Sequence, residues 1–407
     1  MRINGERLKK TITDMAQIGA TPNGGVTRLA LSDEDKDARD LLKRWMIETG
    51  LEIRIDDFGN LYGRRPGTDP EAGAILIGSH LDSVPAGGRF DGVVGVLASL
   101  EVLRTFKDLG IQTKRPVEMV NFTGEEGARF SPPMLGSGGI TQMFSSSFIY
   151  DRVDADGVRF EDELIRIGYR GESPHRAKNV QHFVELHIEQ GPILDTECVP
   201  IGAVEGIVGV SWLEVTVRGV RGHAGSTPMA MRRDALIAAS VMVSAIAEVA
   251  TQADKDLLLT VGKFVPRSSA PNVIPDEVTF SVDIRHYDSL IRKRGVQAVK
   301  DLLMSIGKEK GVDVSVVDLW NMEPTVFSKS LVELICEVSS FLGYPVRKIR
   351  GGIGHDAKYM NEICPSAMIF IPCVEGKSHC EDELASWEDI EKGANVLLHV
   401  VYRLAQQ

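Results

Sequence analysis

Short apolar runs alternate with longer amphipathic runs along the first part of the chain. Residues 74–77, 117–122 and 183–188 predict three buried strands, and residues 93–106 repeat apolar positions at helical spacing. This alternation is typical of an α/β fold with a mostly parallel sheet. Each of the three strands runs into a polar cluster at its carboxyl end. Because ligands bind beyond that end in open α/β sheets, we expect the three clusters to meet in one crevice.

The pattern changes in the middle of the chain, between about residues 209 and 321. Apolar and polar positions alternate strictly over 278–284, which predicts a strand with one exposed face. Together with the other runs this indicates a small inserted α+β sandwich, built from strands near 210–217, 278–284 and 312–319 and helices near 234–250 and 291–310. The α/β pattern then returns with a helix at 331–342, a strand at 367–371 and a helix at 387–404. We therefore expect a two-domain protein, with a catalytic metal-binding domain (1–208 plus 322–407) and an inserted domain (209–321).

Composition narrows the class of protein. A chain of 407 residues is too long for one ordinary core, which agrees with two domains. Asp and Glu exceed Lys and Arg by 57 to 46, a net charge of −11, and no basic run favours nucleic acid. No stretch approaches the roughly 20 apolar residues of a membrane helix, so we expect a cytoplasmic protein. The five cysteines form no CxxC pair, which argues against a structural zinc site.

The first polar cluster is GSHLDS followed by GGRFDG. His80 follows a strand and can offer a ring nitrogen to a metal, while Asp82, two residues on, can orient that ring. Asp91 precedes a glycine that permits a tight backbone around a bridging carboxylate. Taken alone, a histidine at a strand end is more often an ordinary hydrogen-bonded residue. The other clusters reverse that preference.

The second cluster is the pair Glu125 and Glu126 in NFTGEEGARF. Two adjacent carboxylates at a strand end repel each other, and a nearby dication relieves the repulsion. The pair can then divide its work, with Glu126 as a metal ligand and Glu125 as a general base on water. A solvated acidic loop is the alternative interpretation.

The third cluster lies in VELHIEQGP. Strand periodicity places Glu185, His187 and Glu189 on one face, which is expensive in a buried strand without a partner charge or metal. His379 follows the apolar strand at 367–371 and can supply a last ligand. Such a histidine and carboxylate set suits borderline divalent ions such as zinc and manganese. Cobalt and nickel are also compatible with it.

Seven motifs in this order, GSHLDS, GGRFDG, TGEEGARF, ELHIEQGP, RGHAGSTPM, NVIPD and GIGHDA, closely resemble the amidase branch of the M20 metallopeptidase family. That branch includes N-carbamoyl-L-amino-acid hydrolases, β-ureidopropionases and allantoate amidohydrolases. The resemblance runs from VTRLALSDED near the start to the last helix. It implies a dinuclear metallohydrolase domain carrying an inserted domain that serves for dimerisation and as a lid.

The resemblance also implies roles for single residues. Two divalent ions per subunit would be held by three ligands each, with Asp91 shared: His80, Asp91 and His187, and Asp91, Glu126 and His379. Glu125 would be the general base, and Asp82 would support the catalytic site. Substrate contacts would come from Gln190, His223, Asn272 and Arg285, with His223 reaching the neighbouring subunit of a homodimer. The glycine-rich stretch 351–356, with Gly354, would line the pocket, and His355 would have a supporting role.

The chemistry of the implied substrate contacts agrees with these roles. The Arg285 guanidinium suits a bidentate grip on a carboxylate, although a surface ion pair is the plainer alternative. His223 can donate a hydrogen bond to a developing oxyanion, or it is a structural turn histidine. Asn272 can bind either end of a substrate or simply shape a turn.

We therefore predict a metal-dependent hydrolase of N-carbamoyl-L-amino acids that releases the amino acid, carbon dioxide and ammonia. An N-acyl-amino-acid amidase, a dipeptidase and an allantoate amidohydrolase are alternatives on the same site. A non-catalytic dimeric binding protein is a further alternative, disfavoured by the intact ligand set. The segment 380–383 after His379 departs from the Ser-Pro and single Glu of the relatives, so substrate size stays open.

Overall fold

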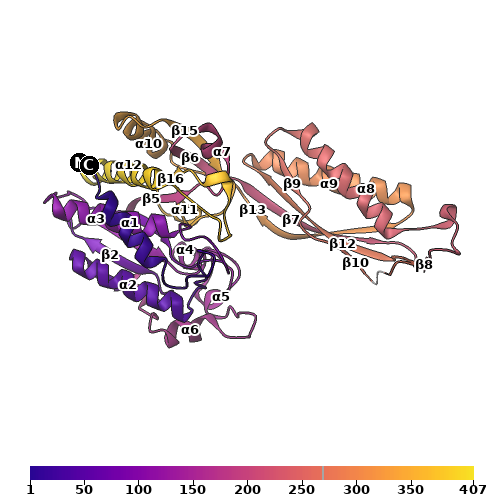
Figure 1. Cartoon of the computed structure of the whole chain (residues 1–407), viewed down its shortest axis with the longest axis horizontal. Helices are drawn as coiled ribbons and strands as arrows, with labels where there is room; N and C mark the ends of the chain where they lie inside the picture. The colour runs from indigo at the N-terminus through magenta and orange to yellow at the C-terminus, as the bar shows by residue number, and fades with distance from the viewer. Residues whose placement is uncertain (268–269) are drawn as a thin grey trace. The chain divides into compact units, whose positions relative to one another are not determined.

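The computed structural model describes residues 1–267 and 270–407 (Figure 1). The chain divides into two compact units, 1–205 with 327–407, and 206–326. The boundaries expected from the sequence, 208/209 and 321/322, differ from these by a few residues.

The first unit is built on a mixed sheet in the order β1-β2-β4-β3-β5-β16-β6-β14, with β15 paired to β6. The four central strands β4, β3, β5 and β16 are parallel, and β1, β2, β6 and β14 pair in antiparallel fashion beside them. The expected mostly parallel sheet is thus confirmed at its centre. The strands are β1 (Glu52–Ile55), β2 (Leu61–Arg65), β3 (Ala74–His80), β4 (Val117–Phe122), β5 (Val180–Ile188), β6 (Ile201–Ile207), β14 (Thr325–Val326), β15 (Val346–Gly351) and β16 (Ser366–Ile371).

Helices bury the central strands, which explains why the strand sequences are almost continuously apolar. Every residue of β3, β4 and β16 is buried. Helices α3 and α12 contact both the sheet and each other, and α1 contacts α3. The helices of this unit are α1 (Gly5–Met15), α2 (Asp33–Thr49), α3 (Val93–Asp108), α4 (Leu135–Ile140), α5 (Ser146–Tyr150), α6 (Phe160–Arg166), α7 (Ile193–Glu197), α10 (Lys329–Phe341), α11 (Asp356–Met360) and α12 (Trp387–Ala405).

The second unit is the expected α+β layer. Its sheet has the order β10-β12-β7-β13, with β9 also paired to β12, and β8 pairs with β11 separately. Along β7 and β12 buried residues alternate with more exposed ones, and helices α8 and α9 contact both strands. The elements are β7 (Gly209–Arg218), β8 (Gly222–His223), α8 (Ala235–Ala253), β9 (Leu258–Thr260), β10 (Phe264–Pro266), β11 (Val273–Ile274), β12 (Glu277–His286), α9 (Ser289–Lys310) and β13 (Asp313–Met322).

The core of this second unit lies between the two helices and one face of the sheet. It includes Val215 and Val217 of β7, Phe280 of β12, Met242 of α8 and Leu303 of α9, all fully buried. Across the described residues of the chain, no helix is both long and apolar enough to cross a membrane.

Candidate metal centre

The polar clusters of the first unit meet at the carboxyl ends of its central parallel strands. His80 is the last residue of β3, and His187 is the penultimate residue of β5. Glu125 and Glu126 lie just beyond β4, which pairs in parallel with β3. His379 lies in the loop after β16, the parallel neighbour of β5. This arrangement follows from the strand order, because parallel strands present their carboxyl ends on one edge.

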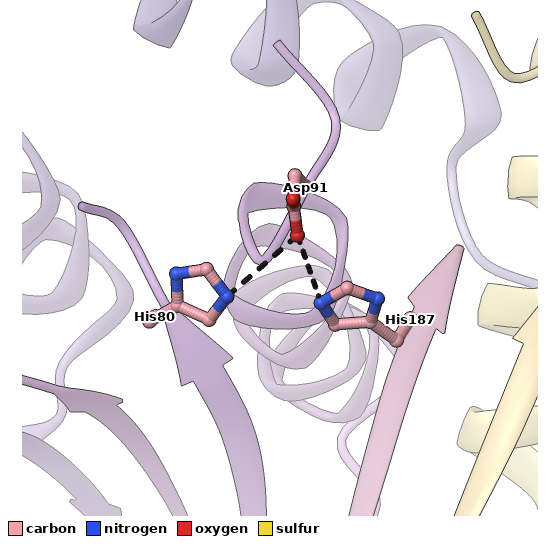
Figure 2. Close-up of side chains that lie close together, drawn as sticks. All are labelled: His80, Asp91 and His187. Atoms are coloured by element: carbon pink, nitrogen blue, oxygen red, sulfur yellow. Dashed lines mark ion pairs between the residues drawn. The ribbon is translucent and has the colours of Figure 1, made fainter. Parts of the chain in front are cut away.

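His80, Asp91 and His187 form a first buried group (Figure 2). Asp91 Oδ1 lies 3.1 Å from His187 Nε2 and 3.8 Å from His80 Nε2. The Nδ1 atoms of the two rings face backbone carbonyls, that of Asp82 for His80 and that of Ile188 for His187, each at 2.9 Å. A carbonyl can only accept, so Nδ1 carries a proton and Nε2 is the nitrogen available to a metal ion or to a second proton.

Asp91, Glu126 and His379 form a second group, which shares Asp91 with the first. His379 Nε2 lies 3.3 Å from Asp91 Oδ2 and 3.4 Å from Glu126 Oε2. The two oxygens of Asp91 therefore face different groups, as a bridging carboxylate requires. The His379 side chain is 45% exposed, whereas His187 is buried.

Asp82 supports the site by a route that differs from the expected one. The backbone carbonyl of Asp82, and not its carboxylate, accepts the hydrogen bond from the His80 ring. The carboxylate lies 3.9 Å from that ring and accepts from the N–H groups of Glu125 and Glu126, each at 3.3 Å. Asp82 thus ties the end of β3 to the loop that carries both glutamates.

The two glutamates that strand periodicity placed beside His187 are compensated by hydrogen-bond donors, and Glu189 falls outside the strand in which it was expected. Glu189 lies beyond the strand, and its carboxylate accepts from the N–H groups of Ile193 and Leu194 in α7. It therefore caps a helix and needs no metal. Glu185 is buried and accepts from the Ser79 hydroxyl at 2.6 Å and the Ala357 N–H at 3.0 Å. Both oxygens of Glu185 accept a hydrogen bond, so its burial is compensated without an ion.

The electrostatics of the cluster separate Asp91 from the other carboxylates. Burial opposes the charge of Asp91, but the neighbouring His187, His379 and His80 bring its pKa well below the usual value. Burial and the nearby Asp91 carboxylate raise the pKa of Glu126 well above its usual value. Burial followed by the charge of Asp356 does the same to the pKa of Glu125.

His187 shows the complementary effect. Burial lowers its affinity for a proton, but the hydrogen bond and charge of Asp91 outweigh burial and raise the pKa of His187 to about 9. The His379 pKa is raised by its hydrogen bond to Asp91. An ordinary protein interior would not gather so many carboxylates and histidines without compensation.

The residues present fit divalent metal ions. Each of the two groups offers three nitrogen and oxygen ligands within 4.8 Å of one another, which is the chemistry that zinc and manganese accept. Glu126 Oε1 is buried and has no hydrogen-bond partner, so a cation is the natural companion for it. Glu125 Oε2 lies 3.6 Å from His80 Nε2, beside the first group and outside both ligand sets.

Glycine at position 92 is a steric requirement of this arrangement. Its φ is +64°, and a Cβ there would lie 2.5 Å from the His80 ring. The sequence motif GGRFDG therefore reflects the close approach of the Asp91 turn to the first histidine.

The amide of Gln190, expected to contact substrate, is hydrogen-bonded to two residues of the site. Gln190 Nε2 donates to Asp91 Oδ2 at 2.8 Å and to Ser378 Oγ at 3.0 Å. His355 is buried, with its ring centroid 4.3 Å from that of His187. Gly354 lies next to it, against the side chain of Met134.

The remaining expected substrate residues lie in the second unit. His223 of β8 pairs with Val273 of β11, and the Ala224 N–H donates to the Asn272 carbonyl, so His223 and Asn272 are neighbours. Arg285, near the end of β12, forms an ion pair at 2.7 Å with Asp283. Substrate contact by these three residues stays a prediction.

Two buried acids of the site were missed from the sequence. Glu383 accepts hydrogen bonds from the N–H groups of Phe90 and Asp91. Asp356 is bonded to the Ser137 hydroxyl at 2.5 Å and raises the pKa of Glu125 through its charge. The acidic run 380–383 gave a signal for Glu383, and the pairing of Asp356 with His355 in GIGHDA gave one for Asp356.

Two histidine and carboxylate groups that share an aspartate, with a buried glutamate beside them, are an arrangement suited to hydrolysis with the help of bound metal ions. Residues 76–403 match the family described as Peptidase family M20/M25/M40, and the chain belongs to this family.

The relatives narrow the branch to amidohydrolases. The chain is 40% identical to the N-carbamoyl-L-amino-acid amidohydrolase of Rhizobium meliloti, over 100% of this chain and 97% of that protein. It is 35% identical to the allantoate amidohydrolase of Escherichia coli, over 99% and 98%. Among solved structures, an amidase of the hydantoinase/carbamoylase family from Burkholderia multivorans is 42% identical, with a TM-score of 0.97 over 100% and 99%.

Proposed function

We propose that this protein hydrolyses the carbamoyl C–N bond of N-carbamoyl-L-amino acids with the help of two divalent metal ions. The observation that carries the proposal is the pair of ligand groups sharing Asp91, with Glu125 beside them. The relative from Rhizobium meliloti is similar over the whole chain, and its name, N-carbamoyl-L-amino-acid amidohydrolase, supports the choice of substrate. His80, Asp91 and His187 would hold one ion, and Asp91, Glu126 and His379 the other. Bound there, the ions would activate water and polarise the carbonyl group.

Glu125 is the residue suited to move the proton. It is buried, and burial together with Asp356 raises its pKa, so it binds a proton more readily than an exposed carboxylate. In the proposed reaction Glu125 takes a proton from the attacking water and gives it to the departing amine. Asp82 holds the backbone of Glu125 in place through its carboxylate.

The recognition of the substrate is assigned to the second unit. The Arg285 guanidinium would bind the substrate carboxylate, and His223 and Asn272 would donate hydrogen bonds to the polar end that reacts. Arg285→Lys keeps the charge but removes the planar fork, so KM should rise with little change in metal content. An unchanged KM would remove Arg285 from the proposal.

The substrate panel is the experiment that tests the function. The protein loaded with Mn²⁺ is offered N-carbamoyl, N-acetyl and dipeptide forms of one amino acid, and also allantoate, and kcat/KM is measured for each. The proposal requires the N-carbamoyl form to give the highest value. Allantoate is the second candidate, favoured by the similarity to the Escherichia coli enzyme, and a higher value for allantoate would replace the first. Preference for the acetyl or dipeptide form would replace both.

We also propose that the chain forms a homodimer through the second unit. Helix α8 leaves two large apolar residues exposed, Ile237 at 56% and Val241 at 37%, with the small Ser240 and Ser244 between and beyond them. Such a face suits a helix of a second copy. Light scattering after size-exclusion chromatography should give a dimer mass for the native protein and a monomer mass for Ile237→Glu. A native monomer would contradict this part of the proposal.

A further inference from the structure

Glu383 is a buried carboxylate, only 3% exposed, in the loop between His379 and α12. Its oxygen Oε1 accepts from the N–H groups of Phe90 at 3.2 Å and Asp91 at 3.1 Å. Its other oxygen, Oε2, accepts from the Ser378 hydroxyl at 2.8 Å. Glu383 thus connects the turn that carries the shared ligand Asp91 with the residue directly before the ligand His379.

A second path joins the same residues through the Asp91 carboxylate, so Glu383, Ser378, Gln190 and Asp91 form a closed circuit of hydrogen bonds. Gln190 Nε2 donates one hydrogen to Asp91 Oδ2 at 2.8 Å and faces Ser378 Oγ at 3.0 Å. Ser378 has one hydroxyl proton, which it gives to Glu383, so its oxygen is left to accept from Gln190. Every donor in the circuit has an acceptor, and the N–H groups of Phe90 and Asp91 share Glu383 Oε1. The backbone and the carboxylate of Asp91 are therefore held by the same set of side chains.

Local geometry directs Glu383 into this place. The Glu383 N–H donates to the Cys380 carbonyl at 3.1 Å, which turns the chain back toward His379. A Cβ at position 88 would collide with the Glu383 carboxylate, so the glycine at that position leaves room for it. Its neighbour Glu381 lies instead toward the surface, where its carboxylate accepts from Thr21 and Asn23.

The placement of Glu383 is expensive for a residue that only closes a loop. A buried carboxylate loses hydration that hydrogen bonds from neutral donors replace only in part. The nearby carboxylate of Asp91 adds to that cost, because two like charges repel each other in a buried site. Divalent ions held by Asp91 would offset both charges.

We propose that Glu383 is a positioning residue that holds Asp91, through its backbone and through Ser378 and Gln190, in the orientation that binds both metal ions. Groups that orient a ligand without touching the metal commonly change metal affinity by about 10–100-fold when removed. This inference rests on the metal-binding part of the proposed function and is independent of the substrate.

The test is a titration of the full-length protein, freed of metal by dialysis against a chelator, with Mn²⁺ in a calorimeter. Glu383→Gln is the main variant. Its amide would direct a donor at Ser378, which then faces two donors and has no acceptor for its own proton. We expect the overall Mn²⁺ affinity to fall by about tenfold or more. The control Glu381→Gln makes the same chemical change in the same loop, and should stay within about twofold of the native protein.

A second variant separates positioning from a general loss of structure. Ser378→Ala breaks the same circuit from the other side and leaves the two backbone hydrogen bonds of Glu383 in place. Each of the two changes breaks the same circuit of hydrogen bonds. The double variant Glu383→Gln/Ser378→Ala should therefore lose far less Mn²⁺ affinity than the product of the two single losses. The melting temperature of each metal-free variant is measured in parallel.

The outcomes are distinct. Native affinity in Glu383→Gln, or losses that multiply in the double variant, would overturn the positioning role. A lower melting temperature with unchanged Mn²⁺ affinity would show a structural tie only, and would overturn it too. If the native protein itself binds no divalent ion, the metal-binding part of the proposed function fails first.

Discussion

The two ligand groups around Asp91 are held in different ways. His80 and His187 sit at the ends of two parallel strands, buried, with each Nδ1 fixed by a backbone carbonyl. Glu126 and His379 sit in loops, and the His379 side chain is 45% exposed. His379 also adopts a φ of +54°, in the left-handed region. The sheet thus fixes the positions of the ligands in the first group, whereas the positions of Glu126 and His379 depend on contacts that hold their loops.

The largest expected effect comes from a residue outside both groups. Glu125→Gln keeps the size of the side chain and leaves every proposed ligand in place. If Glu125 is the general base, kcat should fall by about 10²–10⁴-fold while the protein still binds its metal ions. Metal content is measured by mass spectrometry and kcat with an N-carbamoyl amino acid. Near-normal turnover with full metal content would refute the assignment.

Removing one histidine from each group tests the comparison directly. His187→Ala opens a cavity in the buried group and should lower the free energy of unfolding of the metal-free protein by about 2–3 kcal/mol. His379→Ala affects a half-exposed side chain, and about 1 kcal/mol or less is expected. Urea unfolding of both variants after chelation gives the two values. Equal losses would mean that the groups are held alike.

The pH dependence of stability should change sign with metal. Asp91 holds the pKa of buried His187 at about 9, so the folded state binds that proton more tightly than the unfolded state. The resulting stabilisation is complete below pH 6.5 and is lost as the pH rises through 9. We expect the metal-free protein to lose at most about 3 kcal/mol from His187 over this interval.

Metal binding requires deprotonated ligands, so stabilisation by Mn²⁺ should instead grow over the same interval. Unfolding at pH 6.5 and pH 9, with and without Mn²⁺, measures both trends. Burial raises the pKa values of Glu125 and Glu126, so the folded state binds their protons more tightly than the unfolded state does. Like His187, these two residues therefore make the metal-free protein less stable as the pH rises above their usual pKa. His187→Ala should flatten the metal-free trend, and an unaltered slope in that variant would exclude His187 as its source.

The smallest expected difference is in how readily the two ions leave. The ion held partly by exposed His379 should be removed by a chelator before the ion held by His80 and His187, with rates that differ by about tenfold, or roughly 1.4 kcal/mol in barrier. Biphasic release of Mn²⁺ from the native protein, reduced to one phase in His379→Ala, would agree. A single phase in the native protein would show that the ions leave together.

The sequence predicted most of the fold because its elements have strong and distinct periods. The central strands β3, β4 and β5 were expected from apolar runs, and the sheet of the second unit from strict alternation in β12. The antiparallel strands β1, β2 and β6, which flank the parallel centre of the sheet, were not expected. They are short or partly polar, and their pairing depends on the neighbouring strands more than on their own sequence.

The residues of the site could be predicted where they follow the end of a strand. Contacts between segments far apart in the sequence were much harder to predict. Strand ends brought His80, His187, Glu125 and Glu126 to one edge of the sheet. The placement of Glu189 in the strand and the role of the Asp82 carboxylate were wrong, because both side chains accept backbone N–H groups that a period of two residues cannot reveal. Glu383 accepts a hydrogen bond from the Asp91 N–H, 292 positions away, and no local pattern encodes such a contact.

The pairing of β7 with β13 has a consequence for how the chain can be rebuilt. Val210 lies opposite Met322 and Ser211 opposite Asn321, so the two ends of the second unit leave it side by side. A module with adjacent ends can be cut out and replaced by a short turn, or exchanged for that of a relative. If the second unit recognises the substrate as proposed, such an exchange would transfer substrate preference and leave the ligands of both groups in the host.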